Sequence, residues 1–305
     1  MSETFTYLPP SDDGIFKTLL THPDATNALR SVISSFTKLD VQQVAVVNNE
    51  LHISDIDEKR ERFDVNCVVD RSGDGTGGKQ IEVEMQAEAM KGDNTDNEHK
   101  NMTNRIVSYL CDLHAKQKGE GVIYSELMPS IQITICDYTL LPNEDSFINA
   151  FSLRNENGHE LNKAISLIIV ELSKLANVMK KSVSEMTDAE KWAVFFKYAD
   201  KPKYTEVVNA IAADKGEIME ATRILTNIST DENERAKFRA REKFRRDMAH
   251  NMLVGIREAR EEEQAKASSE RIKSAKALLS NGVSLEIVIK SINLTIDEAE
   301  KLRKE

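Results

Sequence analysis

The residues best suited to carry chemistry lie in a run of alternating polar and apolar side chains, GKQIEVEMQAE at residues 78–88. Within it, Glu82, Glu84 and Gln86 alternate with isoleucine, valine and methionine. Because successive side chains of a strand point to opposite faces, two carboxylates and an amide would share one face. Such a face could bind a metal ion, but the same alternation is typical of a strand whose polar side contacts water. The alternation alone leaves both interpretations open.

A second strand would bring another acid to this face. Residues 63–69, FDVNCVV, alternate in the same way, and the glycine-rich residues 70–79 predict an open turn of a β-hairpin. Asp64 on the first strand and Glu84 on the second can then converge on one Mg²⁺ ion, which prefers carboxylates and waters. Such an ion can activate water and stabilise charge on a scissile phosphate, and Gln86 would orient that water.

One motif in the hairpin resembles a nucleotide site without fitting it. Residues 73–80, GDGTGGKQ, nearly match the loop G-x-x-x-x-G-K-[ST], but Gln80 replaces the hydroxyl that would hold Mg²⁺. The pattern that follows is a strand, whereas this kind of phosphate binding needs a helix N-terminus. The sequence therefore argues against a nucleoside triphosphatase.

The elements around the hairpin predict a mixed core. Helices are expected after the Ser11–Gly14 turn, after Pro23, and over residues 97–118, where apolar residues recur at helical spacing. Strands are expected at residues 41–47, 63–69, 80–87, 130–136, 147–153 and 164–172. This order predicts an α/β or α+β core over residues 1–175.

Strand signals stop after residue 172. A helical extension is expected over residues 176–247, followed by a charged helical connector and a small tail over residues 248–305. The basic residues 235–246 could follow a DNA backbone, but their charges lie all round a helix, which favours a solvated helix. Three short helices in the tail resemble a helix-turn-helix unit, and a helical oligomerisation piece is the equal alternative.

Composition excludes several classes of protein. The 305 residues contain three widely spaced cysteines, which argues against a disulfide framework or zinc ribbon and for the cytoplasm. No secretory signal and no apolar run long enough to span a membrane is visible. The net charge of −10 does not suggest a nucleic-acid binder, although local basic patches matter more than the total.

An ordered set of motifs extends over most of the chain. Asp64 followed by Glu84-x-Gln86 resembles the PD-(D/E)XK nuclease signature, with glutamine in the usual place of lysine. The wider pattern resembles the Rpn family of recombination-promoting nucleases, also described as transposases. The further matching segments are DGIFK at residues 13–17, RIVSY at 105–109, YSELMP at 124–129 and NGVSLEIVIKSINLTIDEAEKL at 281–302.

The resemblance implies an α/β fold with a restriction-endonuclease-like PD-(D/E)XK core, in which helices flank a central mixed sheet, and a helical C-terminal extension. It implies Mg²⁺-dependent hydrolysis of DNA phosphodiester bonds, with Mn²⁺ able to substitute. Carried over by position, Asp64 and Glu84 would be catalytic metal ligands, and Gln86 would position the water. Asp13 would approach the same metal from the first helix, with helix capping as the equal alternative.

Three further residues have expected roles near this site. Arg105 and Tyr109 lie one helical turn apart and would contact a substrate phosphate or brace the site, with a structural role favoured for Tyr109. Glu82 shares the polar face outside the motif spacing and is expected to support it. Gln86 carries no charge and cannot supply the electrostatic stabilisation of a lysine, although glutamine is common here in the family.

The leading hypothesis is a cytoplasmic, Mg²⁺-dependent DNA endonuclease of the Rpn type, acting in recombination, mobile-element biology or defence against foreign DNA. The alternative is a catalytically silent nuclease fold that binds DNA or serves as a scaffold. DNA is the expected partner and no membrane is. A homodimer is a further hypothesis, because a single site cuts one strand and a long charged helix favours pairing.

Overall fold

The computed structural model describes residues 6–47, 65–70, 78–87, 95–117 and 122–292, together with residues 294 and 298. The chain divides into two units, Met1–Arg239 and Ala240–Glu305. Within the described residues, no helix combines the length and the apolar character needed to cross a membrane.

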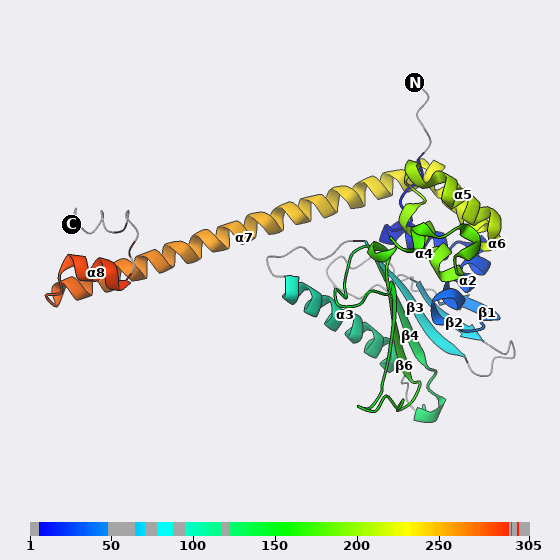
Figure 1. Ribbon diagram of the computed structural model, residues 1–305, viewed down its shortest axis with the longest axis horizontal. Helices are drawn as coiled ribbons and strands as arrows, with labels where there is room; N and C mark the ends of the chain where they lie inside the picture. The colour runs from blue at the N-terminus through cyan, green and yellow to red at the C-terminus, as the bar shows by residue number, and fades with distance from the viewer. Residues whose placement is uncertain are drawn as a thin grey trace, which may run out of the picture. The chain divides into compact units, whose positions relative to one another are not determined.

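A six-stranded mixed sheet forms the centre of the first unit, in the order β1-β2-β3-β4-β6-β5 (Figure 1). The β2–β3 pair is antiparallel, which confirms the predicted hairpin, whereas β3, β4 and β6 run parallel. The strands are β1 (Gln43–Val46), β2 (Val65–Asp70), β3 (Lys79–Gln86), β4 (Ser130–Cys136), β5 (Ile148–Ser152) and β6 (Ile165–Glu171). All six occur where the sequence predicts them, and the predicted α/β fold with helices flanking a mixed sheet is confirmed.

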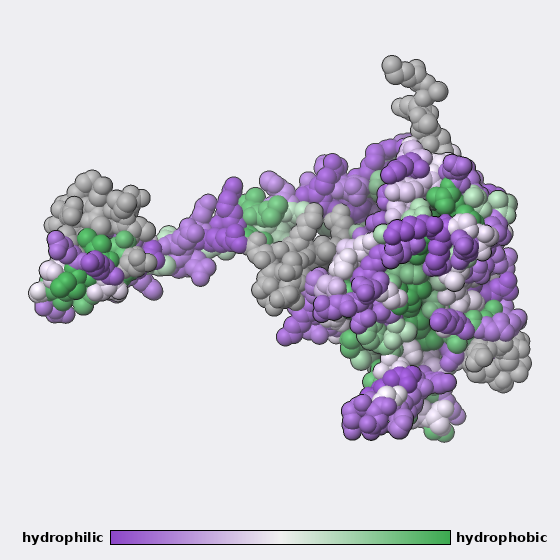
Figure 2. Space-filling model, in the orientation of Figure 1, coloured by the Kyte–Doolittle hydropathy of each residue, from purple (hydrophilic) through white to green (hydrophobic). Residues whose placement is uncertain are grey.

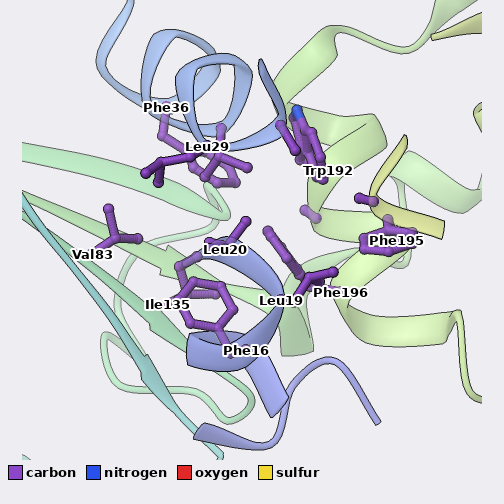
Figure 3. Packing of buried hydrophobic residues seen from close by; sticks show 14 of the residues in the cluster. Phe16, Leu19, Leu20, Leu29, Phe36, Val83, Ile135, Trp192, Phe195 and Phe196 are labelled. Carbon is purple, nitrogen blue, oxygen red and sulfur yellow. The ribbon is translucent and has the colours of Figure 1, made fainter. Parts of the chain in front are cut away.

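One face of the sheet is apolar and carries the main core. Ile81, Val83 and Met85 of β3 are buried there with the isoleucines of β4. Trp192, fully buried, stacks on Phe196 with ring centroids 5.6 Å apart (Figure 3). The covering helices are α1 (Asp13–Leu20), α2 (Thr26–Thr37), α4 (Asp188–Tyr198), α5 (Thr205–Asp214) and α6 (Gly216–Thr230).

Side-chain caps explain where several of these helices begin. Asp12 caps α1 by accepting a hydrogen bond from the Ile15 N–H at 3.1 Å. Thr187 and Glu190 form a capping box at the start of α4. Such caps satisfy the free N–H groups of a helix start, so the local sequence fixes where each helix begins. Single turns of 3-10 helix occur at Pro23–Ala25, Tyr124–Glu126, Leu172–Lys174, Val178–Lys180, Val183–Glu185 and Pro202–Tyr204.

Helix α3 (Thr95–Ala115) covers the opposite face of the sheet (Figure 1). Its buried residues pack on β4, β6 and the segment that follows β4; this second cluster comprises Met102, Ile106, Leu110, Cys136, Leu140, Leu167 and Ile169. Near its C-terminal end, Gln117 donates to the Met128 carbonyl and to the Ser130 hydroxyl at 2.8 and 2.9 Å. These contacts fix α3 over the strands that carry the candidate site.

The second unit consists mainly of one long helix. Helix α7 (Glu232–Ser280) begins in the first unit and continues through residues 240–280, and α8 (Leu285–Ile292) follows a turn at Gly282. Gly282 has a φ of +84°, a conformation that glycine adopts without strain. The predicted charged connector and the first helix of the predicted tail both belong to α7. The continuous helix contains no proline that would break it.

Candidate active site

A row of polar side chains crosses three strands beneath α3. The register places Asn66 of β2, Glu82 of β3 and Gln132 of β4 side by side. Their exposed fractions are 8%, 0% and 0%. A buried polar group costs free energy unless it is compensated, so this face is not a solvated surface. The interpretation of the alternation as a water-facing strand is therefore wrong.

Glu84 is the centre of a hydrogen-bonded cluster on this face. Only 4% of the residue is exposed. Gln86 donates to its Oε1 atom, and the Gln132 Nε2 atom lies 3.4 Å from its Oε2 atom. A guanidinium nitrogen of Arg105, from α3, lies 3.6 Å from Oε1. Three elements, β3, β4 and α3, thus direct donors at one carboxylate.

Burial dominates the electrostatics of Glu84. The loss of hydration raises the pKa of its carboxyl above the ordinary value of 4.5. Arg105 and the amides of Gln86 and Gln132 lower the pKa, but they do not cancel the effect of burial. Because such shifts concentrate at functional sites, Glu84 is the leading candidate for a functional carboxylate.

Tyr109 holds Arg105 in place. The Arg105 Nε atom donates to the Tyr109 hydroxyl at 2.7 Å, and the guanidinium carbon lies 5.0 Å from the centre of the tyrosine ring. Residues four apart on a helix are neighbours, so α3 itself makes this contact possible. Burial disfavours the guanidinium charge, but Glu84 and Tyr109 outweigh burial and raise the pKa of Arg105. Arg105 therefore stays charged beside Glu84.

Gln132 belongs to the cluster although its sequence position was not singled out. Its Nε2 atom faces Glu84, while its Oε1 atom has no hydrogen-bond partner within the described residues. The Asn66 Oδ1 atom likewise has no hydrogen-bond partner within the described residues. The sequence does contain a pattern that could have identified Gln132. In residues 130–136, SIQITIC, Gln132 and Thr134 alternate with isoleucines, as the polar residues of β3 alternate with apolar ones.

The buried cysteines are unsuited to nucleophilic catalysis. Burial raises the pKa of Cys136, beside the site, to about 12. The same cause raises the pKa of Cys67 to about 12. Because the thiolate is the reactive form, neither cysteine supplies a nucleophile at neutral pH.

Of the other two predicted metal ligands, one lies outside the described residues and the other begins helix α1. Asp64 lies outside the described residues, one position before β2. Asp13 begins α1, and its carboxylate accepts a hydrogen bond from the adjacent Gly14 N–H at 2.8 Å. Helix α1 packs on the apolar face, whereas Glu84 faces α3. Metal binding by Asp13 and Asp64 stays a prediction.

Comparison with known proteins identifies the family. The model of the PD-(D/E)XK nuclease family transposases matches residues 10–254. The chain belongs to this family. The match confirms the family predicted from the motifs and supports a nuclease or transposase-like function. Comparison with curated proteins and with solved structures gives no significant match.

PD-(D/E)XK nucleases generally use divalent metals. Within the described residues, no group of three or more His, Cys, Asp or Glu side chains lies close enough to hold a metal. Glu84 nevertheless supplies a carboxylate, and the Asn66 and Gln132 oxygens, which have no partner among the described residues, are hard donors of the kind Mg²⁺ accepts. A bound cation would also offset the burial of the Glu84 charge.

Proposed function

We propose that the chain is a metal-dependent endonuclease of the Rpn type that hydrolyses DNA phosphodiester bonds. The proposal includes a cytoplasmic location and a role in recombination, mobile-element biology or defence against foreign DNA. Mg²⁺ is the proposed ion, with Mn²⁺ able to substitute. When bound, the ion supplies activation of water and stabilisation of the charge that develops on the phosphate.

The protein's own residues have separate proposed roles in this reaction. Glu84 and Asp64 hold the ion, and Asp13 approaches it from α1. Gln86 positions the attacking water, since its amide lies against the Glu84 carboxylate. Because Gln86 carries no charge, the positive charge beside Glu84 comes from Arg105 among the described residues. From this position the Arg105 guanidinium can contact a substrate phosphate.

The observation that carries the proposal is the buried Glu84 carboxylate. Its neighbours include two amides and one guanidinium, yet burial still raises its pKa. A fold retains such a costly arrangement where it serves a purpose other than stability. The arrangement lies within the residues that the PD-(D/E)XK nuclease family model matches, which favours catalysis as that purpose.

One observation favours a second candidate function. Glu84 Oε1 accepts from Gln86 and lies near Arg105, so the carboxylate has partners within the chain. A catalytically silent nuclease fold that binds DNA or acts as a scaffold would use these contacts only to hold α3 on the sheet.

Nicking of supercoiled plasmid in the presence of Mg²⁺ separates the two candidates. The wild type should nick the plasmid, and both Asp64→Asn and Glu84→Gln should abolish nicking. Glu126→Gln changes an exposed acid and serves as the matched control, which should retain activity. If the wild type leaves DNA intact with both Mg²⁺ and Mn²⁺, or if Glu84→Gln nicks at the wild-type rate, the endonuclease proposal fails.

A further inference from the structure

Two lysines between α4 and α5, Lys201 and Lys203, form no ion pair with a carboxylate among the described residues. Figure 2 shows hydrophilic side chains over most of the visible face of the first unit, so hydropathy alone singles out no binding surface there. Ion pairing is more selective. Other lysines in and around α4 do pair with carboxylates, namely Lys174, Lys181, Lys191, Lys197 and Lys215. Since the whole chain has a net charge of −10, such local positive charge decides where a polyanion can approach.

Two tyrosine rings hold these lysines. The Tyr198 and Tyr204 rings lie with their centroids 4.2 Å apart. The Lys201 Nζ atom lies 5.4 Å from the centre of the Tyr198 ring, and the Lys203 Nζ atom lies 5.4 Å from the centre of the Tyr204 ring. Lys201 also donates to the Lys197 carbonyl at 2.7 Å. A ring face attracts a cation without neutralising it, so both ammonium groups are positioned and keep their charge for a ligand.

Direct contacts connect this turn to the strand that carries Glu84. Lys197, in the last turn of α4, forms an ion pair with Asp137. Asp137 directly follows β4, and its N–H donates to the Gln86 carbonyl at 3.0 Å. The lysines are therefore joined to the end of the sheet at which β3 and β4 both end, and Glu84 and Gln86 lie at that end of β3.

We propose that Lys201 and Lys203, held by the two tyrosine rings, bind backbone phosphates of the DNA on one side of the bond that is cut beside Glu84. The inference rests on the proposed function in taking DNA as the substrate. Duplex DNA carries one negative charge for about every 1.7 Å of its axis, so phosphates are available to any cation along its path. An ammonium group meets a phosphate as a point charge and reads no base, so this contact is independent of DNA sequence.

Asp200 is the acid beside these lysines in the sequence. Its Oδ1 atom is buried and has no hydrogen-bond partner within the described residues. Burial raises the pKa of its carboxyl above the ordinary value of 3.8, although Lys201 and Lys197 favour the charged form. One oxygen of Asp200 is thus directed into the protein, and the lysines stay available to an external anion.

Binding of a labelled DNA duplex without divalent metal, measured by fluorescence anisotropy at several salt concentrations, tests the lysines separately from cleavage. Lys201→Gln and Lys203→Gln should each reduce the slope of log affinity against log salt by about one unit, and the double variant by about two. Affinity at about 0.1 M salt should fall roughly tenfold for each lysine. A double variant with the wild-type slope, or a wild type that binds no DNA at micromolar concentration, overturns the proposal.

Lys163→Gln is the matched control. Lys163 is exposed and lies just before β6, at the opposite end of the parallel strands, so its substitution should leave slope and affinity unchanged. A second pair of variants tests the rings. Tyr204→Phe keeps the ring face and should bind like the wild type, whereas Tyr204→Leu should bind more weakly. Equal binding by these two variants would overturn the positioning of Lys203 by the ring.

Plasmid nicking with Mg²⁺ separates this proposal from the endonuclease proposal. If the wild type binds DNA through Lys201 and Lys203 but never nicks it, the endonuclease function is contradicted and the lysine contact stands. If the wild type nicks DNA and the double variant binds as tightly as the wild type, the lysine contact is overturned and the endonuclease function stands.

Discussion

Replacing Glu84 with glutamine should stabilise the fold at neutral pH. The pKa of Glu84 is raised in the folded protein even though Arg105, Gln86 and Gln132 all favour the ionised form. Compared with the unfolded chain, the folded site therefore favours the neutral carboxyl over the carboxylate. Glutamine keeps nearly the same shape and carries no charge, so it mimics that neutral form at every pH.

The size and pH dependence of the effect follow from the direction of the shift. Each pKa unit by which the folded value exceeds the unfolded value corresponds to about 1.4 kcal/mol, so the gain in unfolding free energy grows in proportion to the shift. Since the folded pKa is raised, wild-type stability falls as pH rises from about 4.5 through the folded value. The advantage of Glu84→Gln should be absent in acid, grow through this window and reach a plateau above it.

Urea unfolding at several pH values measures this difference. Glu171→Gln is the matched control, because Glu171 is an equally buried carboxylate at the end of β6. It pairs with Lys174 at 2.5 Å and accepts from the Leu140 and Leu141 N–H groups. Its substitution should destabilise the protein by about 3 kcal/mol, since a buried pair is broken. If Glu84→Gln also destabilises at neutral pH, the reasoning about Glu84 is refuted.

Three further predictions concern the supports of the site and of the core. Arg105→Gln should move the acid limb of the nicking–pH profile to higher pH, because the guanidinium lowers the pKa of Glu84; an unmoved limb would count against this contact. Gln132→Leu should move the limb in the same direction, and an unchanged profile would assign Gln132 to packing alone. Trp192→Ala should lower the unfolding free energy by about 4 kcal/mol in urea titrations, and a loss below about 1 kcal/mol would contradict its place in the core.

The strands could be predicted from sequence because alternation and β-branched residues are local signals. Whether the polar face of β3 is buried or exposed could not be predicted, since the alternation is the same whether water or a helix covers that face. Packing decides it: Met102, Ile106 and Leu110 of α3 lie against β4 and β6, which places the helix over the polar side of the sheet. The single helix α7 runs across the boundary predicted between residues 247 and 248, because a change of charge does not interrupt a helix.

The candidate site could be predicted only in part. The motif spacing singled out Glu84, Gln86 and Arg105, and the structure brings these three together. Gln132 joins them through the parallel β3–β4 pairing, which a single sequence does not specify. The roles of Tyr109 and Asp13 depend on side-chain contacts, which a single sequence does not specify. The Tyr109 hydroxyl accepts a hydrogen bond from Arg105, and the Asp13 carboxylate accepts one from the Gly14 N–H at the start of α1.

Calorimetric titration of the protein with Mg²⁺ tests most directly whether the face beneath α3 is a metal centre. The wild type should bind the ion, Glu84→Gln should bind at least about tenfold more weakly, and the surface variant Glu126→Gln should match the wild type. Equal affinity of the wild type and Glu84→Gln would show that the ion binds elsewhere, and the account of Glu84 as a metal ligand would be wrong.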